Sequence, residues 1–251
     1  MPELDATFFA FAVPAVLFAG ISKAGFGSGA AFASTAILAL VLEPGQALGV
    51  MLPLLTLIDV ASIRPYWKRW TWPESRLLML SGILGVALGA LFLSWTKPDD
   101  LRVLIGAIAL LFVIWLLARR AGVLARVGNN VPNWVGAALG MTAGFTSFVS
   151  HAGGPPAAMY LLARRLDKTE YQATSVLVFT VINIAKFVPY AMLGLFTVQT
   201  AWANLLLAPF ALFGTWLGVR AHRLVSEAVF FGLTYTLLAV TGAKLVFDGL
   251  T

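Results

Sequence analysis

One lysine of this sequence stands in the middle of a long apolar stretch, where a charge is costly. Lys186 lies inside the apolar run 171–196, well away from both of its ends. A lysine near the centre of a bilayer costs about 2.5–3.5 kcal/mol on insertion scales, so it needs a partner or a water-filled site. A cation in such a site can bind an anion. The simpler alternative is a structural salt bridge between Lys186 and Asp59.

Two further basic side chains stand next to clustered glycines. Lys23 lies between Gly20 and Gly25, and His151 comes shortly before Gly153. A helix broken at such glycines exposes main-chain N–H groups and the positive end of a half-helix dipole, which bind anions. Lys23 would add charge to that site or extend to the membrane interface. His151 would bind the anion, carry a proton because a histidine titrates near neutrality, or serve as a hydrogen-bonded core residue.

Small polar groups near these cations complete the candidate site. Their hydroxyl and amide groups donate hydrogen bonds to anions, but the same groups also join helices inside membranes, and both interpretations stay open. The predicted site residues are Lys186, Lys23, His151, Asn183, Gly153, Gly154, Ser150, Ser147, Ser28 and Gly29, with Asp59 and His151 as charge or coupling partners.

The composition places these residues in a membrane. Hydrophobic residues make up 60% of the 251 residues and charged residues 11%, against about 45–50% and about 25% in soluble domains. This excludes an ordinary soluble domain and a disordered chain. The net charge of +6 comes from basic residues in short loops, the positive-inside pattern, so we expect no nucleic-acid partner. With no cysteine and two histidines, we expect no metal and no cofactor.

Apolar runs indicate the helices. Two runs, 7–42 and 132–163, are too long for one spanning helix and are interrupted by clustered glycine, the second also by Pro155-Pro156. Proline removes a donor and clashes with the preceding turn, so we expect each run to form a pair of short or half helices around a break at membrane depth. The other runs are predicted as single spans: 46–63, 76–95, 101–118, 171–196, 200–219 and 227–247.

A glycine-rich break followed by three spans occurs twice in the single transmembrane domain 1–251, in about 7–120 and 132–250. Loop 64–76 is basic while its counterpart 194–200 is uncharged, so corresponding loops lie on opposite sides of the membrane. The predicted fold is therefore an all-α polytopic membrane protein of two inverted repeats, with both termini periplasmic. The matching residues are Ala19-Gly20 with Ala143-Gly144, Gly29 with Gly153, Glu43 with Asp167, Gln46-Ala47 with Gln172-Ala173, Leu84-Gly85 with Phe213-Gly214, and Leu88-Gly89 with Leu217-Gly218.

Inverted repeats with broken segments at matching positions are typical of a secondary transporter and mark its binding site. Two breaks and a later pair of polar residues also carry a family resemblance: Gly25-Phe26-Gly27-Ser28-Gly29, Ala152-Gly153-Gly154-Pro155-Pro156, and Asn183 with Lys186. There the chain resembles the TauE/SafE sulfite exporter family of bacterial inner-membrane anion permeases. The first break departs from the family pattern, since Ala30, Ala31 and Ser34 stand where further glycines and a proline are usual.

The resemblance implies export of a small anion across the inner membrane by alternating access. The anion would be sulfite, an organosulfonate such as sulfoacetate, or a related small organic acid. The expected partners are this anion and the lipid bilayer, and the sequence leaves open proton coupling and a homodimer.

Two other classes compete with a transporter. Ser28 between glycines, with a distant His151, invites an intramembrane enzyme of serine-hydrolase type, but Phe26 stands where such motifs have glycine. A duplicated fold would also be unexplained, because an enzyme needs one site. A non-transporting membrane scaffold would have no need for a lysine at the membrane midplane.

Overall fold

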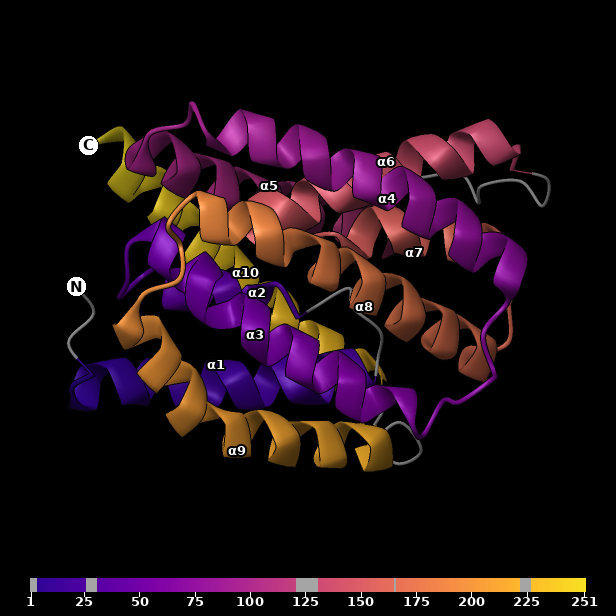
Figure 1. Cartoon of the computed structure of the whole chain (residues 1–251), viewed down its shortest axis with the longest axis horizontal. Helices are drawn as coiled ribbons and strands as arrows, with labels where there is room; N and C mark the ends of the chain where they lie inside the picture. Colours follow the sequence, from indigo (N-terminus) through magenta and orange to yellow (C-terminus); the bar gives the residue numbers. More distant parts are fainter. Residues whose placement is uncertain (1–3, 26–30, 121–130, 165, 222–226) are drawn as a thin grey trace.

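A computed structural model of the protein describes residues 4–25, 31–120, 131–164, 166–221 and 227–251. This part of the chain consists of helices and the connections between them (Figure 1). It contains no strand, so the predicted all-α class is confirmed. In chain order the helices are α1 (Ala6–Gly25), α2 (Ala33–Leu38), α3 (Pro44–Ile63), α4 (Trp72–Leu93), α5 (Pro98–Arg120), α6 (Asn133–Ser150), α7 (Gly154–Ala163), α8 (Lys168–Met192), α9 (Val198–Ala221) and α10 (Glu227–Leu250).

Five of these helices are long and apolar enough to cross a membrane: α1, α3, α4, α8 and the Val198–Arg220 part of α9. The helices α5 and α10, of 23 and 24 residues, occupy the positions of the two remaining predicted spans. Helix α4 also exposes a row of leucines on one face, which in a soluble protein would be an unusual apolar surface. This row consists of Leu80, Leu84, Leu88 and Leu91. The protein is therefore a multi-pass membrane protein, with lipid as a partner.

The two interrupted runs differ in detail from the prediction. Their first members are full-length helices, because α1 has 20 residues and α6 has 18, and only the second members, α2 and α7, are short. The expected pairs of half helices were thus wrong for α1 and α6, and Lys23 lies in the last turn of α1 rather than in a break. The glycines inside these two helices serve close packing instead of interrupting the helix, as the contacts of Gly20 and Gly144 show.

Glycine brings two helix pairs into main-chain contact, α1 with α9 and α4 with α6 (Figure 1). A Cβ atom at Gly20 would collide with the main chain of Gly214, and one at Gly144 with the main chain of Gly82. The sequence match pairs Gly20 with Gly144 and Gly85 with Gly214. The first helix of each predicted repeat thus packs on the fourth helix of the other, which is the arrangement that an inverted duplication requires. The inverted repeat itself stays a prediction.

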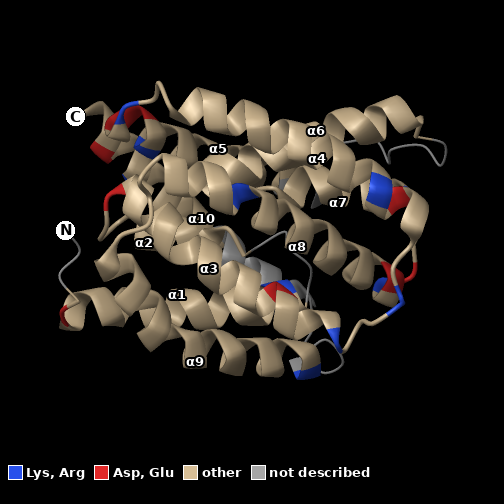
Figure 2. Ribbon diagram, viewed as in Figure 1, with Lys and Arg blue, Asp and Glu red and all other residues tan. Residues whose placement is uncertain are grey.

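The start of α1 and the end of α10 lie at the same end of the helical bundle (Figure 1). The α3–α4 and α7–α8 connections lie at the opposite end, and they carry Arg64, Lys68 and Arg164. Figure 2 shows that charged residues gather toward these two ends and that few lie in between. An apolar middle bounded by two charged ends is what a bilayer selects.

The glycine contacts yield a first prediction. Gly144→Ala and Gly214→Ala should each destabilise the protein by about 1–3 kcal/mol, because a methyl group there meets main-chain atoms that cannot move aside. Thermal unfolding of the purified protein in detergent, followed by tryptophan fluorescence, measures the effect. Gly45→Ala is the control, since its Cβ would approach only the flexible Leu195 side chain, at 3.2 Å. Equal melting temperatures for all three variants would contradict the prediction.

Candidate functional site

Three charged side chains are buried where α1, α3, α6 and α8 meet. Lys23 is 4% exposed, and Asp59 and Lys186 are 0% exposed. Around them lie the buried polar residues Asn183 and Ser147, together with His151 at the end of α6. The apolar helices thus enclose a polar cluster, and most of the predicted site residues are members of it.

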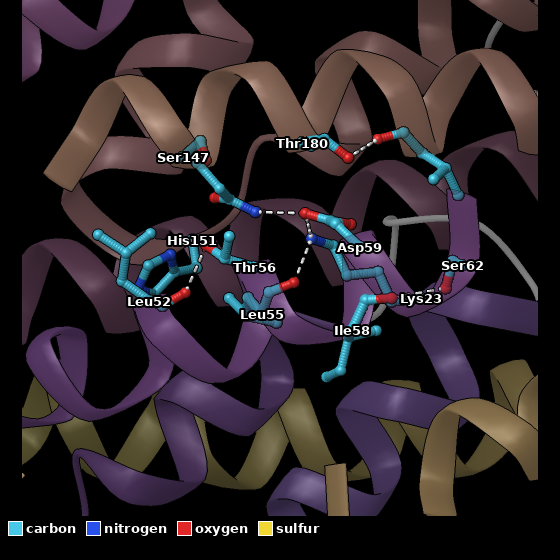
Figure 3. A network of polar contacts seen from close by, with 12 residues as sticks. Lys23, Leu52, Leu55, Thr56, Ile58, Asp59, Ser62, Ser147, His151 and Thr180 are labelled. Carbon is cyan, nitrogen blue, oxygen red and sulfur yellow. Dashed lines mark hydrogen bonds and ion pairs between the residues drawn. The ribbon is translucent and has the colours of Figure 1, made fainter. Parts of the chain in front are cut away.

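Lys23 and Asp59 form an ion pair between α1 and α3. The Lys23 Nζ lies 2.5 Å from the Asp59 Oδ2 and also donates to the Leu55 carbonyl, at 3.4 Å (Figure 3). From α8, the Asn183 amide donates to the same Oδ2 at 2.7 Å. The alternative pairing of Asp59 with Lys186 was wrong. The reason is that α1 stays helical to Gly25, which brings Lys23 to Asp59, while α8 presents Asn183 to this carboxylate.

Lys186 is held by neutral acceptors alone. Its Nζ donates to the Ser147 carbonyl at 2.9 Å and to the Ser147 hydroxyl at 3.1 Å, and lies 2.7 Å from the His151 Nδ1. These three acceptors match the three N–H groups of an ammonium. Within the described ranges it forms no ion pair. Lys186 therefore contributes a positive charge that no carboxylate neutralises directly.

His151 ends α6 in a left-handed conformation, with φ of 57°. Glycine or asparagine usually takes this position, and another residue there carries a conformational cost. Because the Lys186 ammonium donates to Nδ1, the proton of the neutral ring belongs on Nε2, which faces the Leu48 carbonyl at 3.3 Å. The chain thus keeps a strained histidine whose side chain contacts α8 and α3, at the break that the sequence predicts.

The short helix α7 begins three residues after His151, and two main-chain N–H groups at its start are unpaired among the described residues. The N–H groups of Gly153 and Gly154 have no acceptor within the part of the chain that the structure describes, and both residues are buried. A Cβ at Gly153 would collide with the Ser147 side chain, so this helix start lies against the residue that holds Lys186. Two N–H groups, the Lys186 ammonium and the Ser147 hydroxyl therefore come from adjoining segments.

Three side chains that the sequence interpretation missed satisfy carbonyls near the ends of α1 and α6. The Tyr66 hydroxyl donates to the Ala24 carbonyl at 2.7 Å, and the Tyr190 hydroxyl donates to the Phe148 carbonyl at 2.5 Å. Gln172 donates to the carbonyl of Lys23, at 2.7 Å. A helix leaves its last carbonyls unpaired, and here α8 and the α3–α4 connection supply the donors. These three residues could have been found from the sequence, because each is a hydrogen-bonding side chain within or beside a predicted span.

The remaining predicted residues lie apart from this cluster or outside the described ranges. The Ser150 hydroxyl donates to the Thr146 carbonyl at 2.9 Å, one turn earlier in α6. That bond is internal to the helix. Ser28 and Gly29 fall in 26–30, outside the described residues.

An apolar helical bundle with lysine side chains buried at its centre is typical of a polytopic membrane transporter. The chain belongs to the family described as Sulfite exporter TauE/SafE, whose family model matches residues 12–245. The suspected family is therefore confirmed, and the protein is a member of a family of membrane anion exporters. No curated protein and no solved structure matches the chain.

The two lysines should differ in their effect on stability. Lys23→Met leaves Asp59 buried without its cation and should destabilise the protein by about 3 kcal/mol, whereas Lys186→Met strands no carboxylate and should cost much less. The double variant Lys23→Met/Asp59→Asn should regain most of the loss. Thermal unfolding of the purified variants measures all three.

Lys244→Met is the control, because Lys244 forms an exposed ion pair with Asp248. A double variant that is no more stable than Lys23→Met alone would show that the buried pair is not coupled.

Proposed function

We propose that the protein exports a small anion across the bacterial inner membrane by alternating access, with Lys186 as the main contact of the anion. The observation that carries this proposal is the buried Lys186 ammonium, which has only neutral acceptors. Burying a cation at this depth costs free energy, so lysines inside membranes are found mainly at functional sites. Sulfite, a sulfonate such as sulfoacetate, and a short organic acid are the substrates that the family and the site favour.

The anion would bind by replacing a neutral acceptor of Lys186. Exchanging the His151 Nδ1 for an anion oxygen strengthens the hydrogen bond, because a charged acceptor binds an ammonium more tightly than a neutral one. The Ser147 hydroxyl accepts from Lys186 and keeps its own hydrogen for the anion. The N–H groups of Gly153 and Gly154 would complete the site from the start of α7.

The packing of the helices supports alternating access. Helix α3 of the first predicted repeat contacts α8 of the second, and the cluster lies where they meet α1 and α6. At the glycine contacts of α1 with α9 and of α4 with α6, the two predicted repeats meet through main-chain atoms instead of long side chains. Two repeats joined in this way can change their relative position around a fixed central site.

The membrane potential itself favours the export of an anion, by about 2.3 kcal/mol per charge per 100 mV. A uniport cycle is therefore sufficient energetically. In a proton-linked cycle the titrating group would be His151, because it contacts Lys186 directly and would exchange its acceptor role for that of a donor on protonation.

Flux measurements test the role of Lys186. In proteoliposomes loaded with sulfite, Lys186→Met should lower the rate of efflux at least about tenfold, to the rate of sulfite-loaded liposomes without protein, because the anion loses its cation. Lys244→Met should keep the wild-type rate, since this lysine is exposed and pairs with Asp248. Wild-type flux from a folded Lys186→Met variant would overturn the site assignment.

We also propose that both termini face the periplasm. The common end of α1 and α10, together with the basic residues at the opposite end, supports this orientation. A reporter that works only in the periplasm should be active after Thr251 and inactive when inserted after Lys68. Activity after Lys68 alone would reverse the orientation, and activity at both positions would contradict the arrangement of the helices.

A further inference from the structure

The buried cluster carries a charge that can be counted from its contacts. With both lysines protonated and Asp59 ionised, Lys23 and Lys186 contribute one positive charge each, and Asp59 contributes one negative charge. The His151 ring accepts from Lys186 through Nδ1 and is therefore neutral. Among the described residues no other charged side chain takes part in these contacts, so the cluster holds a single net positive charge.

We propose that this single charge restricts the site to singly charged anions, and that Asp59 is the residue that sets the restriction. The inference rests on the proposed anion site at Lys186. A monoanion would neutralise the cluster, whereas a dianion would leave one negative charge buried without a counterion. An unpaired buried charge is strongly unfavourable because the interior screens it poorly.

The geometry keeps Asp59 close to the place of the anion. Asn183 donates to Asp59, and Lys186 follows Asn183 by three residues on the same face of α8, about 4.5 Å further along the helix axis. Asp59 cannot turn away easily, because Lys23 and Asn183 hold the same oxygen from two sides. Its other oxygen, Oδ1, is buried and has no hydrogen-bond partner among the described residues. The carboxylate therefore repels a second negative charge at the site.

The other groups at the site recognise oxygen atoms without adding charge. The Ser147 hydroxyl and the N–H groups of Gly153 and Gly154 are neutral donors. They suit the oxygens of a sulfonate, a carboxylate or bisulfite, which is sulfite with one proton. Sulfate and doubly ionised sulfite present similar oxygens but one charge too many. The same holds for sulfoacetate, which carries a carboxylate beside its sulfonate, so the charge restriction removes it from the candidate substrates. The site is thus specific for charge state rather than for shape.

Methanesulfonate and sulfate provide the test, because both are tetrahedral at sulfur and of similar size but differ by one charge. Binding is measured by isothermal titration calorimetry on the purified full-length protein, at constant ionic strength. The wild type should bind methanesulfonate at least about tenfold more tightly than sulfate. Asp59→Asn raises the net charge of the cluster by one and should shift this ratio at least about tenfold toward sulfate.

The double variant Lys23→Met/Asp59→Asn restores the net charge, so it should restore the preference for methanesulfonate. Asp248→Asn removes a half-buried carboxylate of α10 that pairs with Lys244, and it should leave the ratio unchanged. Should Asp59→Asn fail to fold, the wild-type comparison of methanesulfonate with sulfate still tests the charge restriction. The double variant, which leaves neither Lys23 nor Asp59 without its partner, then tests whether the preference follows the net charge.

Equal affinity of the wild type for the two anions would overturn the charge restriction. An Asp59→Asn ratio equal to that of the double variant would overturn the role of Asp59, since the loss of the side chain rather than of its charge would then matter. A wild-type protein that binds no anion at all would instead overturn the proposed function. The two failures are therefore distinguishable.

Discussion

An ammonium group in the interior of a membrane needs hydrogen-bond acceptors, and in this protein the end of a helix supplies them. The Ser147 carbonyl lies in the last turn of α6, where it accepts from the His151 N–H at 3.0 Å and, with its second lone pair, from Lys186. The break after α6 thus provides acceptors for the cation on one side, and free N–H groups at the start of α7 on the other.

This constraint explains why His151 stands at the turn. The residue at the end of α6 must adopt a left-handed conformation to reverse the chain toward α7, and a glycine would do so without strain. A glycine would also leave Lys186 with two acceptors instead of three. The same histidine contacts the Leu48 carbonyl of α3, so one side chain connects the end of α6, the lysine of α8 and the middle of the bundle at α3.

The sequence identified the residues of the site better than their partners. Lys186 and His151 were predictable because a charge or an imidazole within an apolar run or beside a glycine break has few purely structural uses. The partner of Asp59 was not predictable, because glycine has two opposite effects in a membrane helix: it can stand at a break, as Gly153 does between α6 and α7, or allow close packing, as Gly20 does. The tyrosine bonds to α1 and α6 depend on which carbonyls the helix ends expose, and only the folded chain determines that.

The positions of the two lysines have a consequence for the resting state of the protein. In the sequence match, the counterpart of Lys23 is Ser147 and the counterpart of Lys186 is Val60, so the predicted repeats carry their charges at inequivalent positions. In a perfectly duplicated transporter the inward-open and outward-open forms would be equal in energy, because each is the other with the repeats exchanged. Here the exchange would place a serine where a lysine lies. Under the proposed alternating access, the two forms would therefore differ in energy in the absence of anion, and the unoccupied binding site would favour one side of the membrane.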